Sequence, residues 1–355
     1  MIAPILSLLI GLIALIGGAE LVVRSGSKIA SRLGIPPIVI GLTVVSIGTS
    51  APELAVGIDA IHAGTGSLAI GNIAGTNVVN ILLLLGLSAA LLPLPLDRQT
   101  LRLDLPTIVV ASLLFWALAA DGTLSTFDGA VLFASALAYT ALLIVYVRRQ
   151  RAAGAGPEIA HTEAEVSAGL DARTGPVPLV PAAPGDKAIP TAARTRTTNA
   201  GRWYLPGQLV LLAIGLFVIV KGADWLVGGA EELARAAGVS DAFIGLTIVA
   251  IGTSAPELAT TLLSTIRGER DIAIGNLIGS STFNLTLVLG VSLLVTPGTV
   301  HIDPTLVSLD IPIMVAVAVL CIPVFLTGRR ISRTEGFLFI AAYAVYLGFL
   351  IATRA

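Results

Sequence analysis

Two glutamates stand in identical surroundings inside apolar parts of this chain. The nine residues IGTSAPELA at positions 47–55 occur again, letter for letter, at positions 251–259, so Glu53 in the first copy corresponds to Glu257 in the second. Each copy lies in a stretch that is long and apolar enough to span a membrane. An ionisable side chain is costly in such a stretch and usually marks an ion or proton pathway. The pair therefore predicts a site for cations or protons.

The repetition extends beyond these nine residues at a constant offset of 204 positions. Gly71-Asn72 corresponds to Gly275-Asn276, and Asn80 corresponds to Asn284, at this same offset. The chain is therefore a tandem duplication. Two long copies with acidic residues in apolar segments are typical of the two-repeat architecture of membrane transporters.

The composition indicates a polytopic membrane protein. Hydrophobic residues make up 55% of the 355 residues, charged residues 12%, and the mean hydropathy is +0.93. A net charge of −1 gives no reason to expect a nucleic-acid partner, and the single Cys321 excludes a disulfide framework. An enzyme is not expected, because the chain contains no HExxH motif, no Cys/His pair and no GxSxG elbow. For the same reason no resident cofactor is expected.

Ten apolar segments are long enough to cross a bilayer core, which takes about 20 residues. They lie near residues 2–23, 36–62, 68–92, 104–120, 126–147, 206–229, 240–266, 272–295, 304–327 and 332–352. The predicted fold is an all-α polytopic membrane protein with ten transmembrane helices in two inverted five-helix repeats, residues 1–147 and 206–355. Residues 148–205 are rich in Pro, Ala, Gly and Thr and are expected to form a flexible cytoplasmic linker.

The placement of Lys and Arg sets the expected orientation. Basic residues follow the first, third, fifth, seventh and ninth segments, whereas the opposite side has only Arg235 and Arg354. The positive-inside rule then puts both termini outside. Because each repeat has an odd number of spans, the second must insert upside down relative to the first. Short loops suggest a prokaryotic cytoplasmic membrane, and a chain that supplies both halves of a site is expected to function as a monomer.

A proline precedes each repeated glutamate and predicts a break in its helix. Pro52 and Pro256 lack the N–H that would bond the carbonyl four residues back, at Gly48 and Gly252. The carbonyl groups near these breaks must find other partners, because hydrocarbon offers none. A bound cation is one such partner.

Polar residues recur at every fourth position in the third and eighth segments. They are Asn72, Thr76 and Asn80 in the first repeat and Asn276, Ser280 and Asn284 in the second. That spacing puts each trio on one helix face. With the glutamates they offer carboxylate, hydroxyl, amide and carbonyl oxygens, which suit Ca²⁺ and Na⁺ better than zinc or copper.

Two carboxylates that face each other in a low dielectric cannot both stay ionised without compensation. Either a cation binds or at least one of them takes a proton. We therefore expect Ca²⁺, Na⁺ and H⁺ to compete for one site. Such competition, combined with alternate opening to the two sides of the membrane, produces antiport.

The paired GTSAPE motifs, each followed by a helix with the pattern GN…G…N, resemble the two α-repeats of the sodium/calcium exchanger family. The resemblance covers nearly all ten segments and leaves only the linker outside it. It implies that Na⁺ moving down its gradient drives Ca²⁺ across the membrane, with the first and sixth helices sliding across a rigid remainder. Some members carry Asp at the position of Asn284; with amides at both Asn80 and Asn284, coupling to K⁺ is not expected here.

The same resemblance implies a set of ion ligands. Glu53 and Glu257 would be the central Ca²⁺ ligands, shared with Na⁺. The remaining ligands that it implies are Thr49, Ser50, Thr253, Ser254, Thr76, Asn80, Ser280, Asn284 and the carbonyl groups of Ser46 and Ala250.

Two other readings of the buried carboxylates remain open. A Ca²⁺/H⁺ or other cation/H⁺ antiporter would use the same kind of site. A cation channel would also place carboxylates at the membrane midplane, but channels usually gather them from several subunits around one axis. A requirement for a counter-ion on the far side separates an exchanger from a channel.

Four further acidic residues are expected to have structural roles. Glu20 is expected to pair with Arg24, and Asp224 with Lys221, near the ends of the first and sixth helices. Asp104 and Asp310 each precede a proline by two residues and are interpreted as helix starts.

Overall fold

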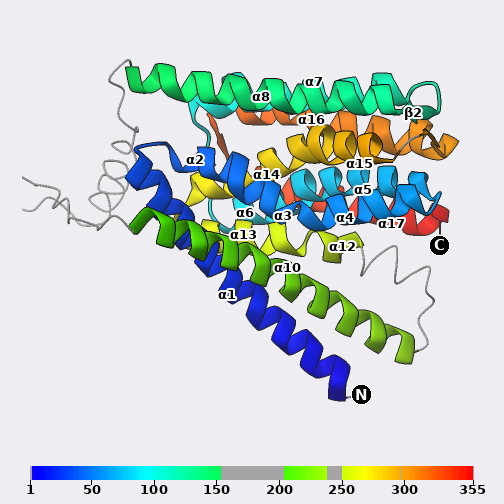
Figure 1. Cartoon of the computed structure of the whole chain (residues 1–355), viewed down its shortest axis with the longest axis horizontal. Coiled ribbons are helices and arrows are strands. Elements are labelled where there is room, and N and C mark those ends of the chain that lie inside the picture. Colours follow the sequence, from blue (N-terminus) through cyan, green and yellow to red (C-terminus); the bar gives the residue numbers. More distant parts are fainter. Residues whose placement is uncertain (1, 153–203, 238–249, 297, 355) are drawn as a thin grey trace, which may run out of the picture.

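The computed structural model describes residues 2–152, 204–237, 250–296 and 298–354, nearly all of them helical (Figure 1). Most of the predicted linker, and the start of the segment predicted at 240–266, lie outside these ranges. In the part that is described, eight helices are long and apolar enough to cross a membrane, and a bent helix pair makes a ninth candidate. The predictions of a helical fold and a multi-pass membrane protein are therefore confirmed.

The single helices are α1 (Ile2–Leu33), α8 (Thr126–Ala152), α10 (Tyr204–Ala236) and α17 (Arg333–Arg354). Four other spans combine α-helix with π-helix, in which each backbone hydrogen bond joins residues five apart. In the first repeat they are α5 (Gly66–Val78), η2 (Val79–Leu85) and α6 (Gly86–Leu91), and then η3 (Thr100–Asp104) and α7 (Leu105–Ala119). In the second repeat they are α14 (Arg270–Phe283), η5 (Asn284–Val288) and α15 (Leu289–Val295), and then η6 (Leu306–Asp310) and α16 (Ile311–Leu326). The first arm of the bent pair consists of α2 (Pro37–Ile40), η1 (Gly41–Val45) and α3 (Ser46–Thr49), and the second arm is α4 (Ala51–His62). The described counterpart in the second repeat is α12 (Ala250–Thr253) followed by α13 (Ala255–Ile266).

Two helices extend further than their predicted C-terminal ends. Helix α1 continues ten residues past the predicted end at 23, and α10 ends at Ala236 rather than 229. In both cases the extra turns carry charged side chains, such as Arg24, Arg32 and Glu231. The run of apolar residues marks only the part of the helix inside the hydrocarbon core, and the helix continues beyond it.

The interpretation of Asp104 and Asp310 as helix starts was wrong. Each is the last residue of a π-helical segment that runs without interruption into the following α-helix. The wide π-turn accommodates Pro106 and Pro312, whose missing N–H groups fall at the junction. Both acids therefore lie inside membrane spans.

Helices α1 and α10 pack along each other and diverge from the other helices toward the N-terminus of α1 (Figure 1). Their interface is a seam of glycines seven residues apart. A Cβ on Gly11 would lie 2.7 Å from the carbonyl oxygen of Gly222, and one on Gly18 would lie 2.9 Å from that of Gly215. The two backbones are thus in direct contact, as at other close helix crossings in membranes.

We expect Gly18→Ala to loosen this seam. Its Cβ would also come within 2.9 Å of the backbone nitrogen of Ile219, and overpacking of this kind costs about 1–3 kcal/mol. The adjacent Gly17 has no neighbour within 4 Å, so Gly17→Ala should be neutral or stabilising, by up to about 1 kcal/mol. Thermal melting in detergent, followed by size-exclusion chromatography, should show a lower midpoint for the first variant only. Equal midpoints would mean that the seam can open at no cost.

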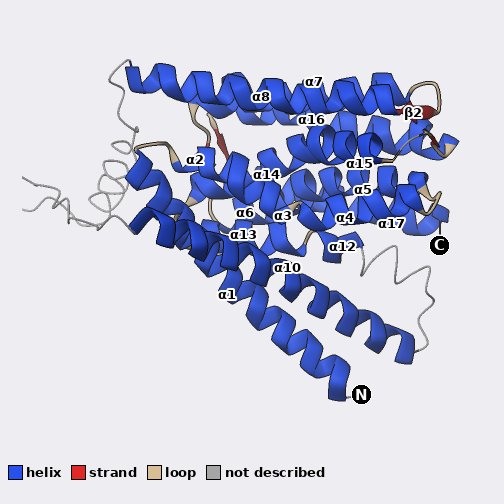
Figure 2. Ribbon diagram, viewed as in Figure 1, coloured by secondary structure: helices blue, strands red, loops and turns tan. Residues whose placement is uncertain are grey.

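Two short strand pairs tie the halves together at opposite ends of the helices (Figure 2). Strand β1 (Leu94–Pro95) pairs with β4 (Arg330–Ile331), and β2 (Thr123–Ser125) pairs with β3 (Thr299–His301), both antiparallel. Strands β1 and β3 occupy the same place in the two repeats, directly after α6 and α15. Equivalent connections therefore lie at opposite ends of the molecule.

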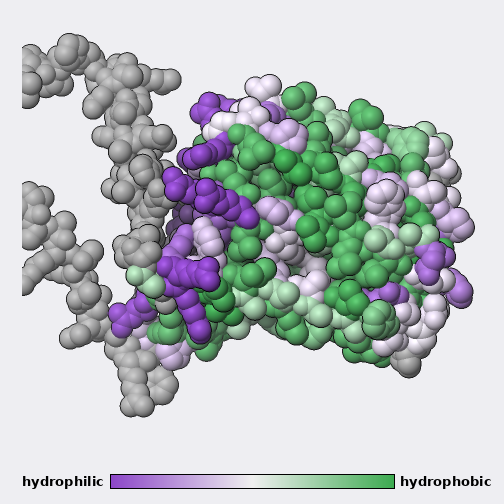
Figure 3. All heavy atoms as spheres, turned by 90° about the horizontal axis from the view of Figure 1, so that it is seen from above, coloured by the Kyte–Doolittle hydropathy of each residue, from purple (hydrophilic) through white to green (hydrophobic). Residues whose placement is uncertain are grey.

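The outer surface between these ends is apolar. Large side chains such as Ile13, Phe127 and Val345 are at least 70% exposed, as expected of residues that face lipid. The space-filling view shows this apolar face, with hydrophilic side chains gathered at one end (Figure 3). Inside, buried hydrophobic residues of both repeats form one large cluster, and a separate cluster lies between α1 and α10.

Candidate cation site

The site begins at the two helix breaks. Helices α3 and α4 meet at Ser50 with a bend of 41°, and the backbone angles of Ser50 (φ −81°, ψ 9°) are nearly repeated at Ser254 (φ −85°, ψ 4°). A proline stands at the start of α4 and of α13, as the predicted breaks require. Each glutamate consequently lies in the first turn of a new helix. There the free N–H groups and the positive end of the helix dipole favour a carboxylate.

Both glutamates point into the protein and not toward lipid. Glu53 and Glu257 are fully buried, and they are close enough for their charges to act on each other. The structure therefore shows two buried carboxylates that interact electrostatically, as a shared cation site requires.

Glu257 is held by residues of both repeats. Its Oε1 accepts hydrogen bonds from Ser50 Oγ and from Ser280 Oγ, each at 3.4 Å. The hydroxyl of Thr49 lies 3.4 Å from Ser280 Oγ. Because Ser50 and Thr49 come from the first repeat, the second repeat's carboxylate sits against the helix break of the first.

Many oxygens around the two glutamates have no hydrogen-bond partner. Among the described residues, the buried atoms without one include Glu53 Oε1 and Oε2, Glu257 Oε2, Thr76 Oγ1, Ser254 Oγ and the amide groups of Asn80 and Asn284. All of these side chains are at least 98% buried. Buried polar groups are rarely left unsatisfied, so a concentration of them indicates a site for a ligand. Most of these atoms are oxygens, which are the kind of ligand that hard cations and protons take.

Asn80 and Asn284 both lie at π-helical turns. Segment η5 begins at Asn284, and Asn80 is the second residue of η2. Such turns widen the helix and are frequent at functional sites. In the fold, η5 contacts α4 and η2 contacts α13, so each asparagine helix packs against the glutamate helix of the other repeat.

The carbonyl group of Ser46 is not free, contrary to the predicted break. It accepts hydrogen bonds from the Ser50 backbone N–H at 3.0 Å, from Thr49 Oγ1 at 3.3 Å and from Ser280 Oγ at 3.5 Å. Pro52 has no N–H to donate to the carbonyl four residues before it, at Gly48, whereas the backbone N–H of Ser50 still bonds the Ser46 carbonyl. To bind an ion, the Ser46 carbonyl oxygen would have to use a lone pair alongside these hydrogen bonds, or the ion would have to take the place of one of the two hydroxyl donors.

Two predicted ligands of the second repeat, Ala250 and Thr253, are the first and last residues of α12, and Thr253 is partly buried.

The every-fourth pattern included Asn276 among the oxygen donors, whereas the ligand set implied by the family resemblance does not contain it. In the structure, Thr49 Oγ1 lies 3.2 Å from the Oδ1 of Asn276, and Asn276 Nδ2 donates to Thr261 Oγ1 at 3.1 Å. Asn276 links the broken helix of the first repeat to α13.

The donor set also limits the kind of ion. No group of three or more His, Cys, Asp or Glu side chains that could hold a metal occurs in the described ranges. Two carboxylates surrounded by neutral oxygens suit hard cations such as Ca²⁺ and Na⁺, and they lack the nitrogen and sulfur ligands that zinc and copper prefer.

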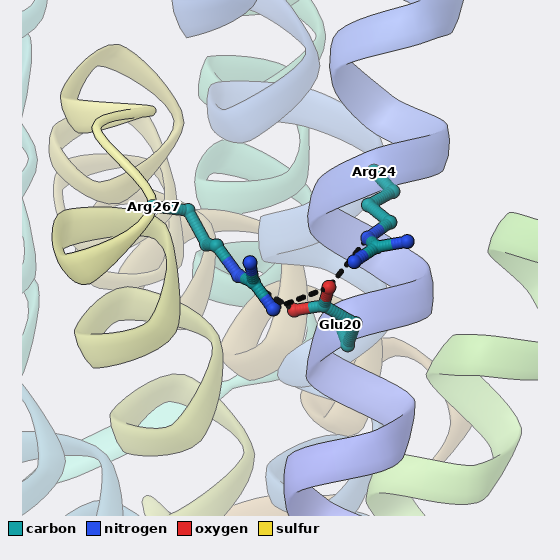
Figure 4. Close-up of polar contacts among 3 residues, drawn as sticks. All are labelled: Glu20, Arg24 and Arg267. Atoms are coloured by element: carbon teal, nitrogen blue, oxygen red, sulfur yellow. Dashed lines mark hydrogen bonds and ion pairs between the residues drawn. The ribbon is translucent and has the colours of Figure 1, made fainter.

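Glu20 lies outside this site. It forms ion pairs with Arg24 on its own helix and with Arg267 beyond the end of α13, whose Nη2 lies 2.7 Å from Glu20 Oε1 (Figure 4). The expected pairing of Lys221 with Asp224 is also present, at 2.9 Å. The ion pairs expected for Glu20 and Asp224 are confirmed. The contact with Arg267, which ties α1 to the second repeat, was not anticipated.

Comparisons with known proteins agree with this geometry. The family model described as sodium/calcium exchanger protein matches residues 3–145 and 207–352. A putative antiporter, CaxA of Alkalimonas amylolytica, is 34% identical over 98% of this chain and 98% of its own length. The sodium/calcium exchanger MaX1 of Methanosarcina acetivorans is 30% identical over 96% and 97%, and the inner membrane protein YrbG of Escherichia coli is 33% identical over 97% and 95%.

A solved structure has the same fold. The sodium-calcium exchanger NCX_Mj, soaked with 10 mM Na⁺ and no Ca²⁺, superposes with a TM-score of 0.75 at 27% sequence identity. The superposition covers 100% of this chain and 99% of that one.

Proposed function

Because the chain belongs to the sodium/calcium exchanger family, a family of transporters, we propose that it exchanges Na⁺ for Ca²⁺ across the membrane by alternating access to the site between its two repeats. One observation supports this most directly. Glu53 and Glu257 are fully buried, interact with each other, and keep oxygens without partners among the described residues. Two such carboxylates match the charge of one Ca²⁺ or of two Na⁺ ions.

The proposed ligands follow from this charge balance. Glu53 and Glu257 bind Ca²⁺ and share Na⁺. The neutral oxygens come from Thr49, Ser50, Thr76, Asn80, Thr253, Ser254, Ser280, Asn284 and the carbonyl groups of Ser46 and Ala250, and we add Asn276, which contacts Thr49. The hydroxyl groups of Ser50 and Ser280 lie within hydrogen-bond distance of Glu257, so their oxygens are placed beside a carboxylate that would bind the ion.

The arrangement in the membrane forms part of the proposal. Ten helices in two inverted repeats are supported by the strand pairs, in which β1 and β3 lie at opposite ends (Figure 2). Arg24, Lys28 and Arg32 in the last turns of α1 support a cytoplasmic position for that end and an outside position for both termini. We propose a monomer in a prokaryotic cytoplasmic membrane, with lipid against the apolar face.

The main alternative is a Ca²⁺/H⁺ antiporter. The observation in its favour is the pair of uncompensated carboxylates, because a proton satisfies such a pair as well as a metal ion does. The two functions differ in which gradient drives Ca²⁺, and not in the site itself.

Flux measurements separate the two. In proteoliposomes, ⁴⁵Ca²⁺ uptake is measured with an outward gradient of Na⁺, K⁺ or H⁺, one at a time. We expect uptake only with Na⁺. Uptake driven by H⁺ alone would establish the alternative, and uptake without any counter-ion would indicate a channel.

Asn284→Asp tests the outer part of the site. A third carboxylate beside the two glutamates adds negative charge where Asn284 is fully buried, so we expect the apparent Ca²⁺ affinity to change by at least about tenfold, roughly 1.4 kcal/mol. The affinity should also become more dependent on pH, because protons compete for the additional acid. The measurement is the Ca²⁺ concentration for half-maximal uptake between pH 6 and about pH 9. An unchanged profile would place Asn284 outside the coordination shell.

A further inference from the structure

A third fully buried carboxylate lies outside the cation site. Asp104 ends the π-helical segment η3 inside the span Thr100–Ala119, and its side chain has no exposed surface. None of the proposed ion ligands forms a hydrogen bond with it in the described ranges. An acid within a membrane span requires either a compensating charge or a proton.

Two neutral donors hold the Asp104 carboxyl group. Tyr139, on α8, donates its hydroxyl to Oδ1 at 3.0 Å, and Gln99 Nε2 lies 3.5 Å from Oδ2. Both donors are themselves buried, at 2% and 1% exposure. The contacts satisfy the oxygens partly but bring no positive charge.

The charges around Asp104 do not compensate it. Among the described residues, no Lys or Arg forms an ion pair with it. The charge that acts on it comes from another carboxylate, Asp97, just before η3. Arg102 is on the same helix but is exposed. From α8, the titratable groups that face this region are the neutral phenols of Tyr139 and Tyr146.

Two neighbouring oxygens lack a donor. Gln99 Oε1 and Thr100 Oγ1 are buried and have no hydrogen-bond partner among the residues described. An ionised Asp104 only accepts hydrogen bonds and cannot donate one to these oxygens, whereas a protonated Asp104 supplies an O–H donor. Because the two ends of the Gln99 amide can be exchanged, its carbonyl oxygen can take the position now 3.5 Å from Oδ2 and accept that O–H.

We propose that Asp104 is a proton-binding site, separate from the cation site, in which the neutral acid, the Tyr139 phenol and the Gln99 amide form one hydrogen-bonded cluster. One proton from water binds the Asp104 carboxylate. The resulting O–H group donates a hydrogen bond to the Gln99 carbonyl oxygen, and the Tyr139 phenol remains protonated and donates to Asp104 Oδ1. No ion ligand of the cation site is displaced.

The cluster is close to the cation site without being part of it. The ring of Tyr139 packs against that of Phe283, with 5.8 Å between centroids, and Phe283 directly precedes Asn284. The proton on Asp104 therefore holds Tyr139, and with it the face of α8 that contacts η5, in one position. This effect does not depend on which cation the protein transports.

Infrared spectroscopy of the purified protein tests this directly. The experiment uses the Glu53→Gln/Glu257→Gln double variant, so that the cation site contributes no carboxylic acid signal. We expect a C=O stretching band of a protonated acid at neutral pH, reduced when Asp104→Asn is added. The matched control is Asp59→Asn, which removes an exposed carboxylate of another helix, α4, and should leave the band unchanged. Identical spectra with and without Asp104→Asn would overturn the proposal, and so would loss of the band with Asp59→Asn alone.

Tyr139→Phe provides a second test that does not depend on the folding of Asp104→Asn. It removes the 3.0 Å hydrogen bond but keeps the ring that packs on Phe283. The acid band should remain and move to higher frequency, because its hydrogen bonding is weaker. A band that does not move would mean that it arises from another acid and would contradict the assignment.

Discussion

Replacing either buried glutamate with glutamine should abolish Ca²⁺ uptake driven by an outward Na⁺ gradient. In Glu53→Gln or Glu257→Gln a single carboxylate remains, and it cannot balance a divalent ion in a site from which water is excluded. Removing one partner from a buried set of charges costs about 3–5 kcal/mol, which corresponds to a loss of roughly a hundredfold or more in Ca²⁺ affinity. The measurement is the initial rate of ⁴⁵Ca²⁺ uptake into proteoliposomes over a range of Ca²⁺ concentrations.

The control for this prediction is an acid on the same helix. Asp59 lies six residues after Glu53 on α4 but is exposed, so Asp59→Asn changes the same type of group without touching the site. Its uptake should stay within about twofold of the wild type. Wild-type uptake by either glutamine variant would show that the buried pair does not bind the transported ion, whatever its position in the fold.

The positions of the helices and of the two glutamates could be predicted from the sequence because the signals are local. A run of about 20 apolar residues determines a span, and a proline one residue before the glutamate determines the break. Both signals occur twice, which fixed the correspondence between Glu53 and Glu257. The structure adds that both side chains are buried and not exposed to lipid.

The contacts that build the site could not be predicted, because they join residues far apart in the chain. Ser50 reaches Glu257 across 207 positions, and Thr49 reaches Asn276 across 227. Spacing along one helix shows which residues share a face but not which face of another helix they meet. The ion pair between Glu20 and Arg267 was missed for the same reason, although the local pair with Arg24 was predicted.

The π-helical segments had no signal in the sequence either. A π-turn depends on one inserted residue in an otherwise regular helix and has no residue type of its own. It shifts all later side chains around the axis, so the every-fourth pattern of Asn276, Ser280 and Asn284 runs up to η5 and cannot be extended past it. The expectation for Asp104 failed at η3 for this reason: the proline two residues later indicated a helix start, and the wide turn removed the need for one.

The second large effect is expected at Gly279, where α14 crosses the broken helix. A Cβ on this residue would lie 2.2 Å from Ser46 Oγ and 2.7 Å from the carbonyl oxygen of Leu42. Rotation of the serine could relieve the first contact, but the second is with backbone and requires one helix to move. We expect Gly279→Ala to lower stability by about 1–3 kcal/mol and to reduce uptake by at least tenfold, because Ser280, which lies within hydrogen-bond distance of the Ser46 carbonyl and of Glu257, is displaced.

The matched measurements are thermal melting and ⁴⁵Ca²⁺ uptake of Gly279→Ala beside Gly348→Ala. Gly348 lies on the exposed face of α17 with no neighbour within 4 Å, so alanine there should improve helix stability slightly and leave uptake unchanged. Adding Ser46→Ala to Gly279→Ala should restore little, because the contact with the Leu42 carbonyl remains. Full recovery in that double variant would mean that the serine hydroxyl alone sets the spacing. Wild-type melting and uptake of Gly279→Ala would show that the two helices are not in contact during transport.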